Sequence, residues 1–440
     1  MATTIHRNVS QPSHWPTVSK ESMKILILSQ YYAPEPTARA HELAASLTRR
    51  GHEVIAITGF PNYPHGEIYD GYKMHLWEWE RREGVSILRL PLFPDHSRSV
   101  MRRSLYYASF AMAASLCGPL IGSHLDAMYV YLHPPTIGIA TLLIRWLRGV
   151  PFVCEIQDLW PESLLATGMV RNQHLLKWLD SLERFVYRHS AAIVAISPGF
   201  VPNLIRKGAP AEKIQVISNW ADESIHHPVP PSPELAQETG MAGRFNVLYT
   251  GNIGPAQGLE TVVEAAEKLQ DLHKVQFVLA GEGVERPCLE AAVARRKLSN
   301  VRFLGQQPVD RMPGLYALAD VLLVHLRRDP LFTTTIPSKT LGYLASGKPI
   351  LAAAPGDVTE IVSQAKAGLT CEAQDSSALA NAVRRFYAMS PDVRLQMGEA
   401  GREIFLQKYS RGALVPRYEQ LLQSVAKRRS PIPQGTSAAC

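Results

Sequence analysis

The sequence predicts an α/β protein built from two doubly wound domains in tandem. First, its 440 residues exceed what a single compact core normally holds. Second, short apolar runs typical of strands alternate with helical patterns in both halves of the chain. Third, this alternation stops over one proline-containing stretch and then starts again. The composition, with 46% hydrophobic and 19% charged residues, is ordinary for a globular protein.

The first predicted domain spans residues 23–222 and opens with a buried parallel strand. Lys24–Ser29 is almost continuously apolar, as in strands that are covered on both faces. A helix is expected next, because Ala40, Leu43 and Leu47 share one face and Gly51 can end it. The later strand-like runs are Val54–Ile57, Val85–Leu90, Ala127–Tyr131, Phe152–Cys154, Ala192–Ile196 and Ile214–Ile217.

A linker and a second Rossmann-like domain are predicted to follow. Residues 223–240 contain several prolines and no apolar periodicity, as expected of a linker. Residues 241–410 repeat the alternation of strands and helices, and residues 411–427 are expected to form a helix that can cross back onto the first domain. The strands of the second domain are predicted at Asn246–Tyr249, Val275–Ala280, Val301–Leu304, Val321–Val324 and Pro349–Leu351. Because ligands of such sheets bind beyond the carboxyl ends of the strands, the two domains are expected to face a common cleft.

The remaining bulk properties narrow the class of protein. Residues 1–22 and 428–440 are predicted to be disordered, and the first segment lacks the apolar core of a signal peptide. The five cysteines form no CxxC pair, which predicts a reduced, cytoplasmic compartment without a disulfide framework. A net charge of +7 fits an anionic membrane surface or a phosphorylated ligand. Nucleic acid is disfavoured, because the chain has no RRM, KH or zinc-finger spacing.

The segment Ile336–Ile350 is the most informative part of the chain. A polar loop leads into a short helix, which is expected to end at Gly347 before a buried strand. Ser338 and Lys339 lie in the first helical turn, where backbone N–H groups and the helix dipole favour an anion. A second glycine-rich loop, Tyr249–Gly258, occurs earlier in the same half. Two such loops in one α/β domain predict a nucleotide-diphosphate ligand.

Five short segments share their order and spacing with a known family. They are Tyr31–Pro36, Phe60–Gly66, Asp158–Ser163, Tyr249–Gly254 and Ile336–Lys339. Together they resemble glycosyltransferase family 4, retaining enzymes of the GT-B fold, and in particular its bacterial branch that builds O-antigen, capsule and colanic-acid-type polysaccharides. The resemblance covers nearly all of residues 24–425. It implies that the first domain binds the acceptor and that the second binds the nucleotide-sugar donor.

The chain departs from the family pattern on the donor side. Many members carry an arginine and a lysine that hold the donor diphosphate, where this chain has Asn252 and Gln257. Lys339 is the expected substitute. The family also commonly has two glutamates where this chain has Thr334 and Gly342, so the acidic contact to the ribose is absent or relocated.

The candidate catalytic residues are Asp158, Glu162 and Lys339. Departure of the donor diphosphate adds negative charge to a phosphate, which Lys339 and preorganised N–H groups would stabilise. Asp158 and Glu162 follow a predicted strand, where a carboxylate can orient or deprotonate the acceptor hydroxyl, although either could instead cap a helix. Gln157 stands where the family has a histidine. In the family's favoured account the leaving phosphate helps to deprotonate the acceptor, so no protein nucleophile is assigned.

The same reasoning assigns the binding residues, in part from the resemblance. The donor-binding candidates are Gly251, Asn252, Gly254, Gln257, Gly258, Glu282, Leu304, Gly305, Pro337, Ser338 and Lys339. The acceptor-binding candidates are Glu35, Arg39, Asn62, Tyr63 and Trp160. We predict no metal site and no cofactor, because the histidines are dispersed and no convincing DxD loop occurs.

A basic and apolar segment raises the question of a membrane. Arg98, Arg102 and Arg103 precede the apolar residues 105–121, which are slightly too few to span a bilayer and are interrupted by Gly118. Basic residues beside an apolar, aromatic segment favour an interfacial helix, and the alternative is a buried helix of the first domain. We therefore expect a cytoplasmic protein, peripheral on the inner face of the plasma membrane, with an anionic membrane surface as a partner.

The leading functional prediction is a retaining hexosyl- or N-acetylhexosaminyltransferase. Its donor is expected to be a nucleoside-diphosphate sugar, with UDP favoured over GDP by family habit, and its acceptor a lipid-linked saccharide of cell-surface polysaccharide biosynthesis. The alternatives are a nucleotide-sugar 2-epimerase of the same fold and a non-catalytic scaffold of polysaccharide assembly. A NAD-dependent dehydrogenase is disfavoured, because Pro34–Pro36 follows the first strand in place of a GxGxxG turn.

Overall fold

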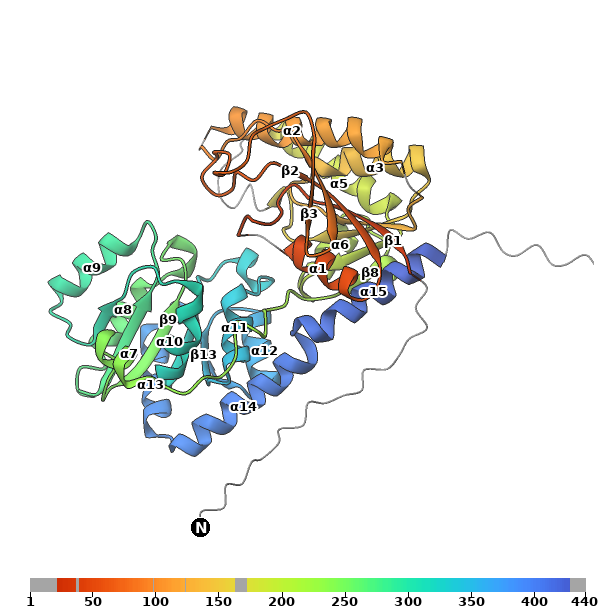
Figure 1. The fold of residues 1–440 in the computed structure, drawn as a ribbon. Coiled ribbons are helices and arrows are strands. Elements are labelled where there is room, and N and C mark those ends of the chain that lie inside the picture. Colours follow the sequence, from red (N-terminus) through yellow and green to blue (C-terminus); the bar gives the residue numbers. More distant parts are fainter. Residues whose placement is uncertain (1–21, 37–38, 98, 123, 163–171, 428–440) are drawn as a thin grey trace, which may run out of the picture.

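The computed structural model describes residues 22–36, 39–97, 99–122, 124–162 and 172–427. These residues form two α/β domains and a pair of long C-terminal helices (Figure 1). The segments predicted to be disordered, 1–22 and 428–440, lie outside the described residues except for Ser22.

The first domain is built on an eight-stranded sheet with the order β3-β4-β2-β1-β5-β6-β7-β8. The described pairs are parallel apart from β3 with β4 at one edge. The strands are β1 (Lys24–Leu28), β2 (Glu53–Gly59), β3 (Glu78–Arg82), β4 (Val85–Leu90), β5 (Ala127–Tyr131), β6 (Phe152–Ile156), β7 (Ala192–Ala195) and β8 (Ile214–Val216). The sequence analysis missed β3, because its charged sequence EWERR carries no apolar run.

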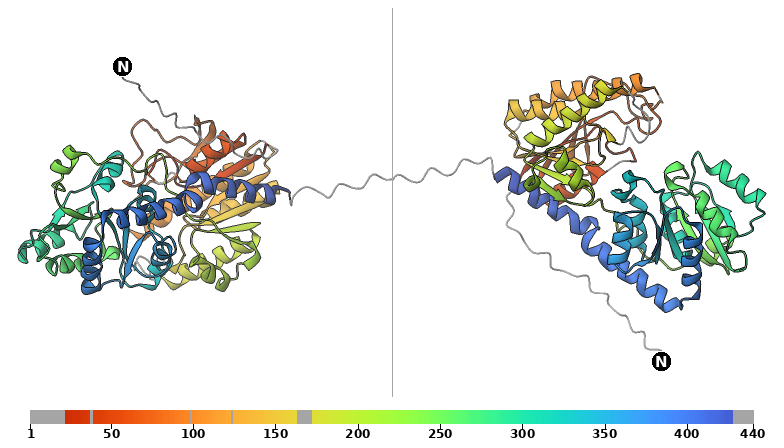
Figure 2. Two further views of the ribbon diagram at one scale, coloured as in Figure 1. Left: turned by 90° about the horizontal axis from the view of Figure 1, so that it is seen from below. Right: turned by 180° about the vertical axis from the view of Figure 1, so that it is seen from behind.

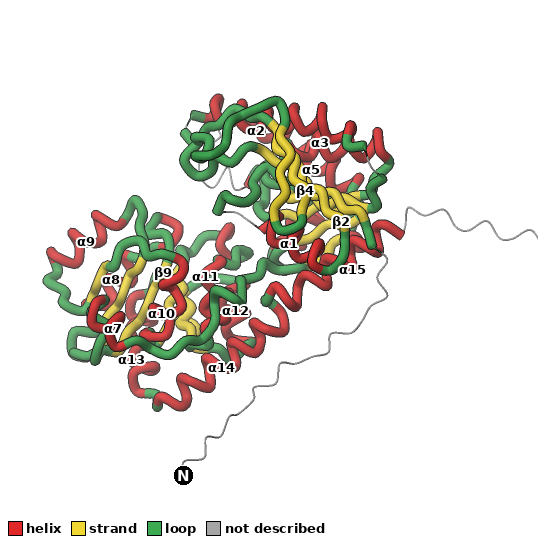
Figure 3. Tube along the Cα trace, viewed as in Figure 1, coloured by secondary structure: helices red, strands yellow, loops and turns green. Residues whose placement is uncertain are grey.

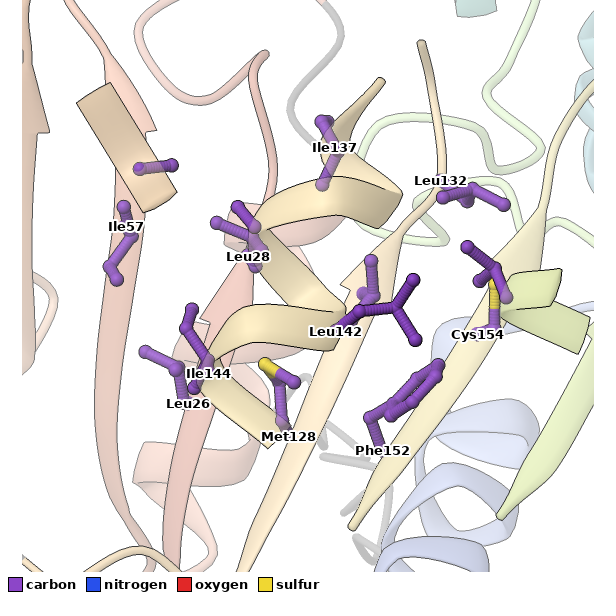
Figure 4. Packing of buried hydrophobic residues seen from close by; sticks show 14 of the residues in the cluster. Leu26, Leu28, Ile57, Met128, Leu132, Ile137, Leu142, Ile144, Phe152 and Cys154 are labelled. Atoms are coloured by element: carbon purple, nitrogen blue, oxygen red, sulfur yellow. The ribbon is translucent and has the colours of Figure 1, made fainter. Parts of the chain in front are cut away.

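Helices cover both faces of this sheet (Figure 3). One face carries α2 (Val100–Cys117), α3 (Ile137–Arg148), α5 (Gln173–His189) and α6 (Phe200–Arg206), and the other carries α1 (Arg39–Arg49). Alternate residues of β1 point to opposite faces, so that Leu26 and Leu28 join the cluster under α3 (Figure 4). This strand is therefore buried on both sides, as its continuous apolar sequence predicted.

The second domain has a six-stranded sheet with the order β11-β10-β9-β12-β13-β14, and the described strand pairs are parallel. Its strands are β9 (Phe245–Thr250), β10 (Val275–Ala280), β11 (Val301–Phe303), β12 (Val321–His325), β13 (Ile350–Ala353) and β14 (Gly368–Cys371). Its helices are α7 (Pro233–Glu238), α8 (Glu260–Glu267), α9 (Arg286–Arg295), α10 (Met312–Leu318), α11 (Ser338–Ser346), α12 (Asp357–Gln364) and α13 (Ser376–Ala388). The predicted architecture of two tandem Rossmann-like domains is confirmed.

The strand order positions the ligand sites. In the first sheet the order reverses between β1 and β5, and in the second it reverses between β9 and β12. At such a switch point the connections leave in opposite directions and open a crevice at the carboxyl ends of the strands.

Helix α7 lies inside the segment predicted to be a linker. The Ser232 hydroxyl accepts a hydrogen bond from the Leu235 N–H at 3.1 Å, and Pro233 occupies the first turn. The helix has only six residues and buries Ala236 alone, so it leaves no visible apolar periodicity. The connection between the domains therefore ends before Ser232, and the rest of the predicted linker belongs to the second domain.

The two C-terminal helices run along one side of both domains (Figure 2). Helix α14 (Pro391–Lys408) packs on α11 in the second domain. Helix α15 (Arg411–Lys427) buries Leu414, Tyr418 and Leu422 against the first domain. Between these helices, Ser410 forms a parallel bridge with Ala221, so that two passages of the chain between the domains lie side by side. No helix in the described part of the chain is both long and apolar enough to cross a bilayer.

Candidate active site

A pocket of about 660 Å³ lies at the carboxyl ends of β1, β5 and β6, where the first sheet has its switch point. Thr335 and Ile336 of the second domain complete the lining, so the pocket belongs to the cleft between the domains. Eight of the 23 lining residues carry an aromatic ring. The rings come from Tyr31, Tyr63, His96, Tyr107, Tyr131, His133, Trp160 and Trp178.

Two of the predicted acceptor-binding residues, Tyr63 and Trp160, line this pocket. The Tyr63 ring packs edge-on against Tyr31 with 5.4 Å between the ring centroids, and Trp160 packs edge-on against Tyr107 at 6.4 Å. The indole N–H of Trp160 is buried and has no hydrogen-bond partner among the described residues. It is therefore available to donate to a ligand in the pocket.

Asp158 also lines the pocket and lies beside a histidine. Its Oδ2 is 3.1 Å from Nδ1 of His133, which follows β5. The Asp158 side chain is 51% exposed, so the pair is open to the cleft. Although Nδ1 lies close to the carboxylate, it has no hydrogen-bond partner among the described residues, so the two groups are neighbours that can both face a ligand. The same argument from strand ends that selected Asp158 would have found His133, because its strand was predicted correctly.

Gln157 is held in place by two contacts. Its amide nitrogen donates to the Glu155 carboxylate and to Asn219 Oδ1, the second at 3.1 Å. It also lines the pocket, but as a neutral side chain that serves neither as a base nor as a cation. Asp158 and His133 lie at this end of β5 and β6 and line the pocket, where they can contact an acceptor.

The structure corrects the expectation for Glu162. Its carboxylate lies 2.9 Å from the Lys207 ammonium group and accepts a hydrogen bond from Asn203 at 3.0 Å. Lys207 also binds Glu183 at 2.8 Å, and burial raises the pKa of Glu183 to about 7. Glu162 is absent from the pocket lining. Its place is in a partly buried ionic cluster between helices, which the sequence could not reveal because the partners are distant along the chain.

Glu35 and Asn62 support the pocket from behind. The Glu35 side chain is buried, and its carboxylate accepts the backbone N–H groups of Tyr32, Asn62 and Tyr63 at 2.8 to 3.0 Å. Burial raises the pKa of Glu35. The Asn62 amide donates to the Phe60 carbonyl at 2.9 Å. Both predicted acceptor residues are thus committed to bracing the loop that carries Tyr63, which corrects their assignment as contacts.

Arg39 is likewise turned into the protein. Its guanidinium pairs with Glu155 at 3.2 Å, donates to the Ser218 carbonyl at 3.1 Å and stacks on Trp220 at 3.7 Å. It also contacts the Tyr418 hydroxyl of α15 at 3.4 Å. Arg39 therefore joins α1 to the C-terminal helix and does not reach the pocket, contrary to the expectation that it faces an acceptor diphosphate.

In the second domain, Lys339 lies against the loop that follows β9. Gly251 adopts a φ of +116°, and a Cβ there would lie 3.1 Å from Lys339 Nζ. The ammonium group sits 3.7 Å from the centroid of the Tyr249 ring and has no hydrogen-bond partner among the described residues. Burial lowers the pKa of Lys339 to about 7. The structure thus brings the two predicted phosphate loops together. A bound anion would raise the pKa of Lys339 again and so favour its fully protonated form.

The surroundings of Lys339 contain further hydrogen-bond donors but no acidic group from the β9 loop. Asn252 and Gln257 are 3.3 Å apart and hydrogen-bonded to each other, and Gln257 Oε1 also accepts the Gly254 N–H at 3.2 Å. Helix α11 begins at Ser338 after Pro337, without a side-chain cap. The Thr340 N–H donates to the Pro337 carbonyl at 2.9 Å, so the N–H groups of Ser338 and Lys339 are the ones in this turn that an anion could engage.

The other donor-side candidates gather at the ends of β10 and β11. Glu282 forms an ion pair with Arg286, and a Cβ on Gly305 would lie 3.3 Å from the same guanidinium. The Leu304 N–H donates to the Leu279 carbonyl at 2.9 Å. The sequence analysis did not predict the ion pair with Arg286. This pair occupies the Glu282 carboxylate, which was expected to contact a hydroxyl group of the donor.

Gly342 stands where the family commonly has a glutamate, and the connection between the domains passes close to this position. A Cβ on Gly342 would lie 3.5 Å from Nδ1 of His226. Burial lowers the pKa of His226, and its ring packs near Tyr316 with 6.1 Å between centroids. Across the described part of the chain, no three His, Cys, Asp or Glu side chains are grouped so that they could hold a metal ion.

Comparison with known proteins matches both halves of the chain. Residues 36–220 match the family described as "Glycosyl transferase 4-like domain", and residues 233–404 match "Glycosyl transferases group 1". The putative colanic acid biosynthesis glycosyl transferase WcaI of Escherichia coli is 30% identical over 340 residues, which is 74% of this chain and 82% of that protein. The probable glycosyltransferase WbjE of Pseudomonas aeruginosa is 25% identical over 61% of this chain and 67% of its own length.

Solved structures share the fold. A sucrose-phosphate synthase from Thermosynechococcus elongatus superposes with a TM-score of 0.71 at 19% identity, covering 92% of this chain and all of its own. HepE from Anabaena, crystallised with UDP, superposes with a TM-score of 0.69 at 18% identity, covering 91% of this chain and all of its own. Together with the two family matches and the likeness to WcaI, the two-domain fold establishes that the chain is an enzyme of glycosyltransferase family 4, the retaining GT-B transferases that use nucleotide-sugar donors.

Proposed function

We propose that this enzyme transfers a sugar from a UDP-sugar to a lipid-linked saccharide during the synthesis of a cell-surface polysaccharide. The observation that carries the proposal is the aromatic pocket in the first domain, whose volume of about 660 Å³ suits a saccharide with an apolar attachment. Aromatic faces pack well on hydrocarbon chains and on the apolar faces of sugar rings. The Asp158–His133 pair at its base would orient the acceptor hydroxyl.

The donor side supports the same proposal. The β9 loop, Lys339 and the free N–H groups of α11 converge at the switch point of the second sheet, where a diphosphate would sit. WcaI is described by its name as a colanic acid biosynthesis enzyme, and HepE was crystallised with UDP and with UDP-glucose. These relatives favour a UDP-sugar and polysaccharide assembly over the other donors and pathways that the fold permits.

A two-step experiment tests the proposal. A thermal-shift screen with UDP, GDP, ADP and their sugars identifies the nucleotide, because a ligand that binds only the folded state raises the melting temperature. Transfer is then measured to a polyprenyl-diphosphate-linked saccharide and to the same saccharide without lipid. We expect a UDP-sugar to be used and the lipid-linked acceptor to be preferred. Release of an epimerised nucleotide sugar without transfer would favour the epimerase, and no turnover of any donor would favour the scaffold.

The helices on the outer face of the first domain suggest how a lipid-linked acceptor arrives. Helices α2, α3 and α5 lie side by side there (Figure 1). Each exposes large apolar side chains, which we call the apolar face. They are Met101, Leu105, Met112 and Leu116 of α2, Ile139, Trp146 and Leu147 of α3, and Trp178 and Phe185 of α5.

The apolar face adjoins the pocket. Val100 and Trp178 line the pocket and are 42% and 47% exposed, so the pocket opens beside this face. Arg102 pairs with Asp95 at 2.8 Å, and Arg103 donates to the Tyr107 hydroxyl at 3.1 Å. Arg98 lies outside the described residues. We therefore propose that exposed apolar side chains, more than the three predicted arginines, hold the protein peripherally on a cytoplasmic membrane surface.

Replacing Met112 and Leu116 with serine should weaken binding to anionic phospholipid vesicles by about tenfold to a hundredfold. Each side chain contributes up to about 1.5–3 kcal/mol when it is buried in an apolar medium. Sedimentation with vesicles measures the effect. The matched control replaces Leu395 and Leu406 of α14, which are 56% and 44% exposed on the second domain, and should leave binding unchanged. If the wild-type protein does not sediment with anionic vesicles even at low salt, the membrane proposal fails.

Nucleotide binding should weaken as the pH rises above about 7. Burial lowers the pKa of Lys339 to about 7 in the empty site, and a bound diphosphate would raise it again. Below pH 7 the amine is already charged, whereas above pH 7 binding must take up a proton, which costs up to about tenfold in affinity per pH unit. Calorimetric titration of UDP between pH 6 and 9 measures this. Lys339→Arg should remove the dependence, because arginine stays protonated. A flat profile in the wild type would contradict the prediction.

A further inference from the structure

Two basic side chains flank opposite ends of the β9 loop. Lys339 lies at Gly251, and Arg327 lies at Gly258, seven residues later. The Arg327 N–H donates to the Ala256 carbonyl at 3.0 Å, which fixes its backbone to the loop. Gly258 has a φ of +58°, and a Cβ there would lie 2.9 Å from Arg327 Cγ. Glycine at this position therefore leaves room for the arginine side chain to lie across the loop.

Two buried polar atoms beside the β9 loop have no hydrogen-bond partner among the described residues. They are Lys339 Nζ and Nε2 of His325, whose ring lies next to Gly258. His325 ends β12 and is 1% exposed, and its Nδ1 is 2.6 Å from the Gln257 carbonyl, to which it donates. Buried polar groups in proteins are nearly always paired. A group of unpaired ones at the switch point of the sheet indicates where the oxygen atoms of a ligand belong.

Arg327 and the neighbouring Arg328 differ in their contacts. The Arg328 guanidinium pairs with Glu372 at 2.9 Å and donates to the Ala373 carbonyl at 2.9 Å. Arg327 is exposed, and its guanidinium forms no ion pair with any carboxylate of the described residues. Its charge is therefore available to a ligand, whereas that of Arg328 is already used at the edge of the sheet.

The chemistry of donor cleavage requires more positive charge than Lys339 supplies. A departing nucleoside diphosphate carries several negative charges, while Asn252 and Gln257 are neutral and paired with each other. Burial lowers the pKa of Lys339 to about 7, so this side chain is only partly charged before the donor binds. Arginine remains protonated at any relevant pH, and its guanidinium group can donate two parallel hydrogen bonds to phosphate oxygens.

We propose that Arg327 is the second cation that holds the leaving diphosphate of the donor, in place of the basic residues that the β9 loop lacks. The inference rests on the proposed function, because it assumes that a nucleoside-diphosphate sugar binds in the second domain. It goes further in assigning part of the phosphate contact to the second residue after β12, a position that the sequence analysis did not single out.

The test compares Arg327→Ala with Arg328→Ala. Calorimetry measures the affinities for UDP, GDP and inorganic pyrophosphate at low and high salt, and a transfer assay gives kcat and KM. We expect Arg327→Ala to weaken diphosphate binding by about tenfold to a hundredfold and to reduce its salt dependence, whereas Arg328→Ala changes affinity by less than about twofold. Arg327→Lys should restore part of the loss. Equal melting temperatures of the variants establish that the fold is intact, and Arg327→Gln serves if the alanine variant is unstable.

The outcomes separate this inference from the proposed function. Unchanged diphosphate affinity in a folded Arg327→Ala protein overturns the role of Arg327, while the proposed transferase activity stands. Equal losses in the Arg327 and Arg328 variants also overturn it, because the effect is then one of overall charge. A wild-type protein that binds neither UDP, GDP nor pyrophosphate overturns both.

Discussion

Lys339→Ala is expected to slow sugar transfer and to weaken donor binding by about 2–4 kcal/mol, or ~30- to 1000-fold. The ammonium group lies at Gly251, where a diphosphate would sit. Loss of this group should destabilise the transition state more than the bound donor, because negative charge grows on the leaving phosphate during the reaction. Steady-state kinetics and nucleotide titration measure the two effects separately.

A second lysine on the same segment provides the control. Lys348 follows α11, and its ammonium group donates to the Ala317 carbonyl at 2.7 Å, at the end of the helix away from the cleft. Lys348→Ala should lower stability slightly and leave nucleotide affinity as it was. Wild-type affinity and turnover in a folded Lys339→Ala protein would remove Lys339 from the donor site.

Asp158→Asn is expected to reduce transfer by about 10²-fold or more, the usual scale for a general acid–base group. The change keeps the shape of the side chain but removes the negative charge that lies 3.1 Å from His133. Nucleotide affinity should barely change, because the donor loops lie in the other domain. Single-turnover transfer with saturating donor, combined with UDP titration, distinguishes these effects.

A double-mutant cycle tests whether Asp158 and His133 act together. If they do, His133→Asn alone and the double variant should each lose about as much activity as Asp158→Asn, so that the losses do not add. Asp126→Asn is the control, since Asp126 precedes β5 at the opposite end of the same strand and its carboxylate accepts the Lys24 N–H at 2.7 Å. Full activity in a stable Asp158→Asn protein would leave Asp158 with a structural role only.

Most strands of both sheets were predictable because parallel strands covered on both faces have continuous apolar sequences. Lys24–Ser29 is the clearest case, and its residues indeed alternate between two clusters. The sequence analysis did not predict β14, whose four residues GLTC are only partly buried. The proximity of the two phosphate-type loops agrees with the electrostatic argument for a lysine in the first turn of a helix, and the donor site itself stays a prediction. The charged edge strand β3 and the six-residue helix α7 gave no such signal.

The predicted roles of individual polar residues were less accurate, because those roles depend on partners far along the chain. Arg39 is bound to Glu155, more than a hundred residues away, and Glu162 to Lys207. A strand-end position gives no information about such pairing. The two adjacent arginines after β12 are equivalent in the sequence, and only the contact of Arg328 with Glu372 separates them.

The return of α15 to the first domain has a consequence for domain exchange. The first folding unit is discontinuous: it comprises the residues up to Ala221 together with those that follow Ser410, where the chain crosses a second time. A chimaera joined at the interdomain connection alone would pair the first sheet with a foreign last helix, and the buried surface around Leu414 and Tyr418 would not match. The second domain is therefore best exchanged between such enzymes as an inserted segment with two junctions, each placed at the bridge between Ala221 and Ser410.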